Sequence, residues 1–137
     1  SSISRNRKIK GRYKMKKNKI DMNTNVKRVS NIILNSKTHI QSICCVNFGE
    51  DNDKINRFIE LLAADLKKRN EAVDKEEYRI LNMHSIINNA EAFFEAGKSD
   101  TTLIFIKGNE VNGNQAMEWK RELEMNGANI LGAVYLQ

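Results

Sequence analysis

Short apolar runs alternate with longer amphipathic segments along most of this chain, and this alternation is its most constraining feature. Four runs have the length and the branched or aromatic content of strands: 42–48, 78–83, 101–107 and 130–135. Four other segments carry apolar residues at helical spacing: 24–35, 53–69, 86–96 and 114–126. Such alternation is typical of a parallel sheet covered on both faces. We therefore predict an α/β fold, a three-layer domain with a small, mostly parallel sheet of about four strands flanked by helices.

The ends of these helices must be located without proline, because the chain contains none. Asn23 or Thr24 is available as the cap of the first helix. Gly97 and Gly127 follow the third and fourth helical patterns, and glycine is the residue that most often ends a helix. We expect these boundaries to hold to within a few residues.

The only two cysteines are adjacent, Cys44 and Cys45, within an apolar run. Neighbours on a strand point to opposite faces, so a disulfide between them is geometrically poor. The only histidines, His39 and His84, match no zinc-binding spacing, and we predict no metal site. Both cysteines are interpreted as small, reduced core residues, which suits a reducing cytoplasm.

Charge is distributed unevenly along the chain. Residues 1–19 contain nine basic residues and no acidic one. The rest of the chain contains the other 14 of the 23 basic residues and all 17 acidic ones. We expect residues 1–20 to be a basic tail outside the fold and residues 21–137 to be one domain. The tail is either a solvated, disordered arm or a contact for anionic surfaces. Its basic residues are Arg5, Arg7, Lys8, Lys10, Arg12, Lys14, Lys16, Lys17 and Lys19.

No apolar run approaches the roughly 20 residues that a membrane-spanning helix needs, so we expect residues 1–137 to be soluble. The chain begins at Ser1 rather than Met, which leaves open that it is a fragment of a membrane-anchored protein.

Two segments in the second half of the chain carry a family resemblance. One runs from Ser99 to Lys107, and the other, Gly-Ala-Asn-Ile-Leu-Gly-Ala-Val, runs from Gly127 to Val134. Together with a strand, an acidic glycine-containing loop and a helix before them, they resemble the bacterial tyrosine kinases of capsule and exopolysaccharide synthesis. Those kinases belong to the deviant P-loop ATPases, and the likeness covers about residues 24–137. It implies a P-loop-kinase-like domain preceded by a juxtamembrane tail.

The loop that would hold phosphate departs from that family. A phosphate-binding loop needs glycines for close backbone approach, a lysine for the β and γ phosphates, and a hydroxyl residue for magnesium. Lys54 stands where the lysine belongs, but aspartates replace the glycines and Ile55 replaces the hydroxyl residue. The added carboxylates repel a triphosphate. We predict that no nucleotide or other cofactor binds this degenerate loop, which comprises Gly49, Glu50, Asp51, Asp53 and Lys54.

Other parts of the kinase machinery are also missing. The connector after Asn70 leaves no room for the aspartate-bearing strand that follows the first helix in the family. The next strand ends in Asn82 and His84 where an aspartate is expected, and the tyrosine-rich tail of the family is absent. The joint loss favours a pseudoenzyme with no catalytic residues.

Several residues admit a second interpretation. His84 beside Ser85 is a loop histidine rather than half of a nucleophilic pair, because no Gly-x-Ser-x-Gly turn exposes the serine. Lys54 and Arg57 are expected to pair with the acidic neighbours that cap the helix, in preference to grasping an anion. Core spacing assigns the aromatic residues Phe93, Phe94 and Trp119 to the interior rather than to a base-stacking surface.

These observations lead to one preferred function and two alternatives. The preferred one is a catalytically inactive pseudokinase domain, an adaptor or regulator in capsular or exopolysaccharide biosynthesis or export. It would act in the cytoplasm at the inner membrane face, with a protein partner from the polysaccharide-assembly machinery and the anionic membrane surface. The first alternative is a nucleic-acid-binding module that uses the basic tail, and the second is an enzyme with an unrecognised active site.

Overall fold

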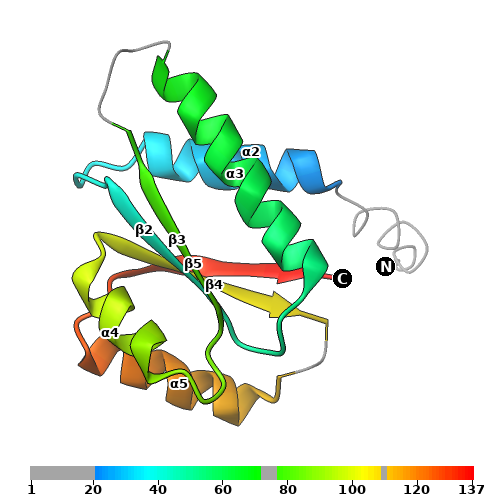
Figure 1. Cartoon of the computed structure of the whole chain (residues 1–137), viewed down its shortest axis with the longest axis vertical. Helices are drawn as coiled ribbons and strands as arrows, with labels where there is room; N and C mark the ends of the chain where they lie inside the picture. Colours follow the sequence, from blue (N-terminus) through cyan, green and yellow to red (C-terminus); the bar gives the residue numbers. More distant parts are fainter. Residues whose placement is uncertain (1–20, 72–76, 109–110) are drawn as a thin grey trace, which may run out of the picture.

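The structure is a computed structural model that describes residues 21–71, 77–108 and 111–137. Helices and strands alternate along the described chain (Figure 1). In order, they are α2 (Met22–Leu34), β2 (Ser42–Asn47), α3 (Asp53–Glu71), β3 (Arg79–Ser85), α4 (Ala90–Lys98), β4 (Thr101–Lys107), α5 (Gly113–Met125) and β5 (Ile130–Leu136). The predicted alternation is therefore confirmed.

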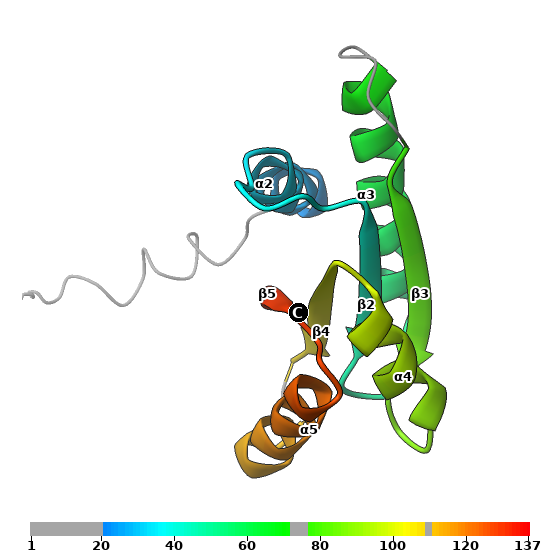
Figure 2. The same ribbon diagram turned by 90° about the vertical axis from the view of Figure 1, so that its left-hand side faces the viewer.

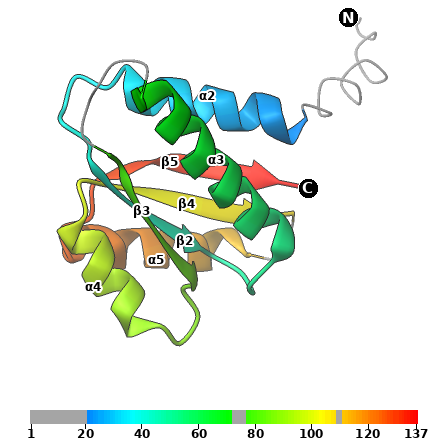
Figure 3. The ribbon, with the colours of Figure 1, turned by 45° about the horizontal axis from the view of Figure 1, so that its top comes forward.

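The four strands form one parallel sheet in the order β3-β2-β4-β5. Helices α2 and α3 cover one face, and α4 and α5 cover the other (Figure 3). This arrangement confirms the predicted three-layer α/β fold. Both faces of the central strands β2 and β4 are buried, which explains why their sequences are apolar almost throughout instead of alternating.

Each face of the sheet has its own core. On the α2 and α3 side, Phe58 packs edge-on against Phe105 with ring centroids 5.4 Å apart. On the α4 and α5 side, Cys44 and Ile104 pack with Ala92, Ala96 and Leu123.

The adjacent cysteines occupy one core each, Cys45 on the α3 side and Cys44 on the α4 side. Both are buried free thiols, which confirms the sequence interpretation. Burial, and then the charge of Glu95, raises the pKa of the Cys44 thiol to about 12. Burial, and then Cys44, raises the pKa of Cys45. Both thiols therefore stay protonated and inert at neutral pH.

The third helix begins later than predicted. The apolar pair Ile86 and Ile87 matches a helical pattern, yet α4 starts at Ala90. Asn88 has a φ of 55°, which breaks the helix before it can include Ile86, and the Asn89 side chain instead donates hydrogen bonds to the carbonyl groups of Met83 and Ser85. Ile86 is buried as part of a connection, so its apolar character reflects packing and not helix.

Three smaller predictions are also wrong. Asp21 caps α2, since its carboxylate accepts from the Thr24 N–H at 2.8 Å, so neither Asn23 nor Thr24 is the cap. Gly97 lies inside α4 and does not end it. Phe94 is 56% exposed with the Lys98 ammonium 4.9 Å from its ring centroid, whereas Phe93 and Trp119 pack against the core.

Asp100 joins the first residues of the two central strands. Its carboxylate accepts hydrogen bonds from the backbone N–H groups of Gln41 at 2.8 Å and Ser42 at 3.0 Å. The Ser42 hydroxyl accepts from the Asp100 N–H in return, at 2.8 Å. The bond from the Ser42 N–H, followed by that from Gln41, holds the pKa of Asp100 below its ordinary value.

This lowered pKa makes stability depend on pH. A carboxylate with a depressed folded-state pKa adds stability above its unfolded value, about 3.9, and that contribution is lost as the pH falls through the folded value. We expect Asp100→Asn to lower the free energy of unfolding at pH 7 by about 1 kcal/mol, a value reduced for solvent screening. Urea unfolding of both proteins should show the difference shrinking as the pH falls through the lowered folded-state pKa of Asp100. Glu118→Gln, on the exposed face of α5, is the matched control and should change little at either pH.

Candidate functional site

The order of the strands marks one edge of the sheet as the place for a site. The connection after β2 leads to α3 on one face, and the connection after β4 leads to α5 on the opposite face. In open α/β sheets, ligands bind at such a switch point, outside the carboxyl ends of the strands. The loop between Asn47 and Asp53 lies there, so the fold places the predicted degenerate loop at the expected position.

Backbone groups of this loop form hydrogen bonds with side chains of the protein. The Gly49 N–H donates to Asn47 Oδ1 at 2.8 Å, and Asn47 Nδ2 donates to the Glu50 carbonyl at 2.6 Å. The Ser85 hydroxyl, from the end of β3, donates to the Gly49 carbonyl at 2.7 Å. Asn47 is buried, so its amide fixes the loop from below. The Gly49 N–H is the kind of group that a phosphate-binding loop directs toward its ligand, and here it is directed toward Asn47 instead.

Backbone N–H groups at the amino end of α3 also have a side-chain acceptor within the protein. Asn52 Oδ1 accepts from the N–H groups of Lys54 at 2.8 Å and Ile55 at 3.2 Å. These are the free donors that make a helix amino terminus an anion site. The prediction that the acidic neighbours cap this helix is wrong, because an uncharged amide does so. Asn52 at this position is itself a favoured cap and could have been recognised from the sequence.

Asp51, in the loop after β2, and His84, near the end of β3, close the site. His84 therefore belongs to the strand, and its prediction as a loop histidine is wrong. Asp51 Oδ1 lies 3.0 Å from His84 Nδ1 and 3.4 Å from Asn56 Nδ2. The hydrogen bond with His84 is the main cause that lowers the pKa of Asp51, which keeps this carboxylate negative. His84 has a φ of 61°, a rare conformation for a residue with a side chain, and its N–H donates to Asn82 Oδ1 at 2.9 Å.

The two basic residues at this end contact other partners than predicted. Lys54 Nζ donates to the Gln137 carbonyl at 2.9 Å, so it joins the start of α3 to the residue after β5. Arg57 pairs along its own helix with Glu60 at 3.7 Å. The expected pairing of Lys54 and Arg57 with the loop carboxylates is therefore wrong, because Lys54 contacts Gln137 and Arg57 contacts Glu60 instead.

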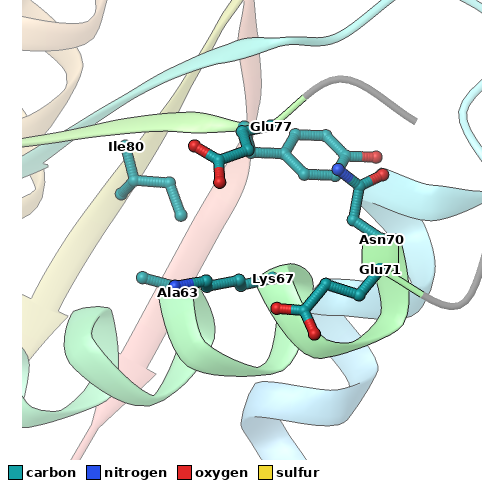
Figure 4. A pocket seen from close by; sticks show the side chains of 7 residues that line it. Ala63, Lys67, Asn70, Glu71, Glu77 and Ile80 are labelled. Atoms are coloured by element: carbon teal, nitrogen blue, oxygen red, sulfur yellow. The ribbon is translucent and has the colours of Figure 1, made fainter. Parts of the chain in front are cut away.

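A cavity of about 490 Å³ lies at the other end of the sheet, between the last turns of α3 and the start of β3. Glu77 comes from the strand side, and Lys67 and Glu71 come from the helix side (Figure 4). Its full lining is Ala63, Lys67, Asn70, Glu71, Glu77, Tyr78 and Ile80. Its mixed charges select no ligand class, and sequence patterns give no signal for it.

Two predicted features remain to be placed. The nine basic residues of segment 1–19 lie outside the described residues. Within the part of the chain that the structure describes, no group of three or more His, Cys, Asp or Glu side chains could hold a metal ion. No described helix combines the length and apolar character needed to cross a membrane.

Comparisons with protein-family models, curated proteins and solved structures find no match.

The cap supplied by Asn52 can be tested directly. We expect Asn52→Ala to lower the free energy of unfolding by about 1 kcal/mol, because two backbone donors of α3 lose their acceptor. Asn23→Ala on α2 is the control, since Asn23 is exposed and Asp21 caps that helix; it should change stability by less than about 0.5 kcal/mol. Equal losses in urea unfolding of the two variants would contradict the assignment.

Proposed function

We propose that this chain is a catalytically inactive, kinase-like domain that acts by binding. Its role is that of an adaptor or regulator in capsular or exopolysaccharide biosynthesis or export, at the cytoplasmic face of the membrane. The observation that carries the proposal is the closed loop after β2, in which Asn47 and Asn52 accept hydrogen bonds from the backbone N–H groups that a phosphate would need, while Ser85 holds the Gly49 carbonyl. A phosphate can reach those donors only by displacing bonds already made within the protein.

Electrostatics supports the same conclusion. Asp51 stays ionised beside the loop, and Glu50 and Asp53 are exposed next to it. A phosphate charge at about 4 Å from one carboxylate is repelled by about 1 kcal/mol in water and about 4 kcal/mol at an effective dielectric constant of 20. Asp51 is exposed, so the lower figure applies to it most closely. With three carboxylates present, binding of a polyphosphate is unfavourable without magnesium ligands to offset their charge.

The pathway part of the proposal rests on the sequence resemblance. The two segments that carry it, Ser99 to Lys107 and Gly127 to Val134, fall on the paired parallel strands β4 and β5. Gly127 has a φ of 91° between α5 and β5, a conformation that favours glycine. The motif is therefore compatible with the fold that it predicts, and the adaptor role follows from the family and not from the geometry.

The basic tail separates the adaptor role from the nucleic-acid alternative. We expect the full chain to bind vesicles containing about one third anionic lipid, and the binding to weaken with salt. Deletion of residues 1–19 should abolish it, and duplex DNA should bind more weakly than the vesicles at the same ionic strength. Tighter, deletion-sensitive binding to DNA would favour the nucleic-acid module. Binding that the deletion leaves unchanged would reject both roles of the tail.

A further inference from the structure

The outer edge of β5 is an uncharged row of main-chain groups that no strand covers among the described residues. β5 is the last strand in the sheet order and forms one margin of the sheet (Figure 2). The Gly108 N–H donates to the Leu136 carbonyl at 2.7 Å, so the main-chain groups of Leu136 point toward β4. Successive residues of a parallel strand direct their main-chain N–H and C=O groups alternately to its two sides. The N–H and C=O groups of Ala133 and Tyr135 therefore point away from β4, toward solvent.

Natural edge strands are usually protected by charged residues or proline, and β5 has neither. The opposite margin, β3, is protected, because it carries the basic residues Arg79 and His84. The His84 N–H also donates a hydrogen bond to the Asn82 side chain. A bulge at the start of β5, where Leu131 has no partner in β4, leaves the remaining edge from Gly132 to Leu136 regular. Of the two margins, β5 is the one open to pairing.

Apolar side chains flank this edge on both faces of the sheet. Tyr135 is 69% exposed and, because Leu136 points into the α2 and α3 core, it faces the α5 side. On the other face, Ile32 of α2 is 56% exposed and lines a hollow of about 480 Å³ together with Leu131. An added strand would cover these side chains as well as the main-chain groups.

We propose that a second copy of this chain pairs with β5 antiparallel about a two-fold axis, which joins the two sheets into one of eight strands. Ala133 is the middle residue of β5, so it would lie opposite its own copy and exchange two main-chain hydrogen bonds with it. At the axis only Ala133 lies opposite its own copy, and the other residues pair with different residues of the partner strand. Because β5 contains no charged residue, this pairing places no like charges opposite one another. The chain's own basic tail fits poorly, because its lysines and arginines would lie against Ile32 and Tyr135.

This inference is independent of the proposed function. It predicts a modest interface of one strand and a few side chains, hence a dissociation constant in the range of about 1 to 100 µM. Sedimentation of the full chain should show a monomer–dimer equilibrium in that range. Amide hydrogen exchange at Ala133 and Tyr135 should slow as the concentration rises, because these amides gain acceptors only in the dimer.

Two variants test the contact. Ala133→Pro removes an outward N–H without removing a bond to β4, and Tyr135→Lys places a charged side chain at a position that the partner strand would cover. Each should weaken the dimer by about tenfold or more, since every lost contact occurs twice. Phe94→Lys is the matched control, because it replaces another exposed aromatic, on α4, and should leave the dimer intact. Thermal unfolding monitored by circular dichroism shows whether each variant is folded.

Three outcomes would overturn the proposal. The first is a chain that is monomeric at about 1 mM, well above the expected range. The second is a dimer that Tyr135→Lys leaves unchanged, which would place the interface elsewhere. The third is protection of the Ala133 and Tyr135 amides that does not depend on concentration, which would mean that another segment of the same chain covers the edge.

Discussion

Phe105→Ala is expected to lower the free energy of unfolding by about 3–5 kcal/mol, a large part of the stability of a domain of this size. Phe105 is fully buried in the middle of β4, and its ring contacts Phe58 of α3. The substitution removes apolar contact and leaves a cavity that the surrounding strands cannot close. Urea unfolding at 25 °C measures the loss, and Phe94→Ala on the exposed face of α4 should cost less than about 1 kcal/mol.

The Phe58 and Phe105 pair also tests the packing of α3 on the sheet. A double-mutant cycle with Phe58→Ala should give a coupling energy of about 0.5–1.5 kcal/mol, as expected for edge-on rings 5.4 Å apart. Additive losses would mean that the two rings do not touch, and α3 would then not lie where it is described.

Gly97→Ala should lower stability by about 2 kcal/mol, although alanine normally favours a helix. A Cβ atom at Gly97 would come within 2.1 Å of the Asn126 carbonyl oxygen, which is backbone and cannot move aside cheaply. The gain in helix propensity is about 1 kcal/mol. The clash, which costs about 3 kcal/mol where backbone must shift, outweighs it.

Gly113→Ala is the matched control for this prediction. Nothing lies within 4 Å of a Cβ atom at Gly113, in the first turn of α5. We expect this variant to be as stable as the original chain or more stable by up to about 1 kcal/mol. If both glycine variants were equally stable in thermal unfolding, the close approach of α4 to the end of α5 would be contradicted.

The sequence is sufficient to predict the elements with strong periodicity. Strand β4 spans the predicted residues, and α3 begins at the predicted residue, because β-branched residues in the one and a clear apolar face in the other admit a single interpretation. The prediction for Ile86 is wrong because a buried residue in a connection is as apolar as one in a helix. The prediction for Gly97 is wrong for a related reason: a glycine required by packing cannot be distinguished locally from one that ends a helix.

The site is predictable in position but not in its contacts. A strand followed by a polar loop and a helix places Gly49 to Lys54 at the carboxyl edge of a parallel sheet. The pairing of Asp51 with His84 joins residues 33 positions apart, and it depends on β3 lying beside β2. The bond from Lys54 to Gln137 depends likewise on where β5 ends. No local pattern specifies these neighbours, so charge proximity along the chain predicts the wrong partners.

Titration of the full chain with ATP and magnesium tests the central claim most directly. Calorimetry should give no saturable heat up to about 1 mM nucleotide, and the amide signals of Gly49 to Lys54 should not shift in NMR spectra. The reason is that Asn47 and Asn52 already hold the loop donors, while Asp51 remains charged beside them. Saturable binding at about micromolar nucleotide, with shifts centred on Gly49 and Lys54, would contradict the account.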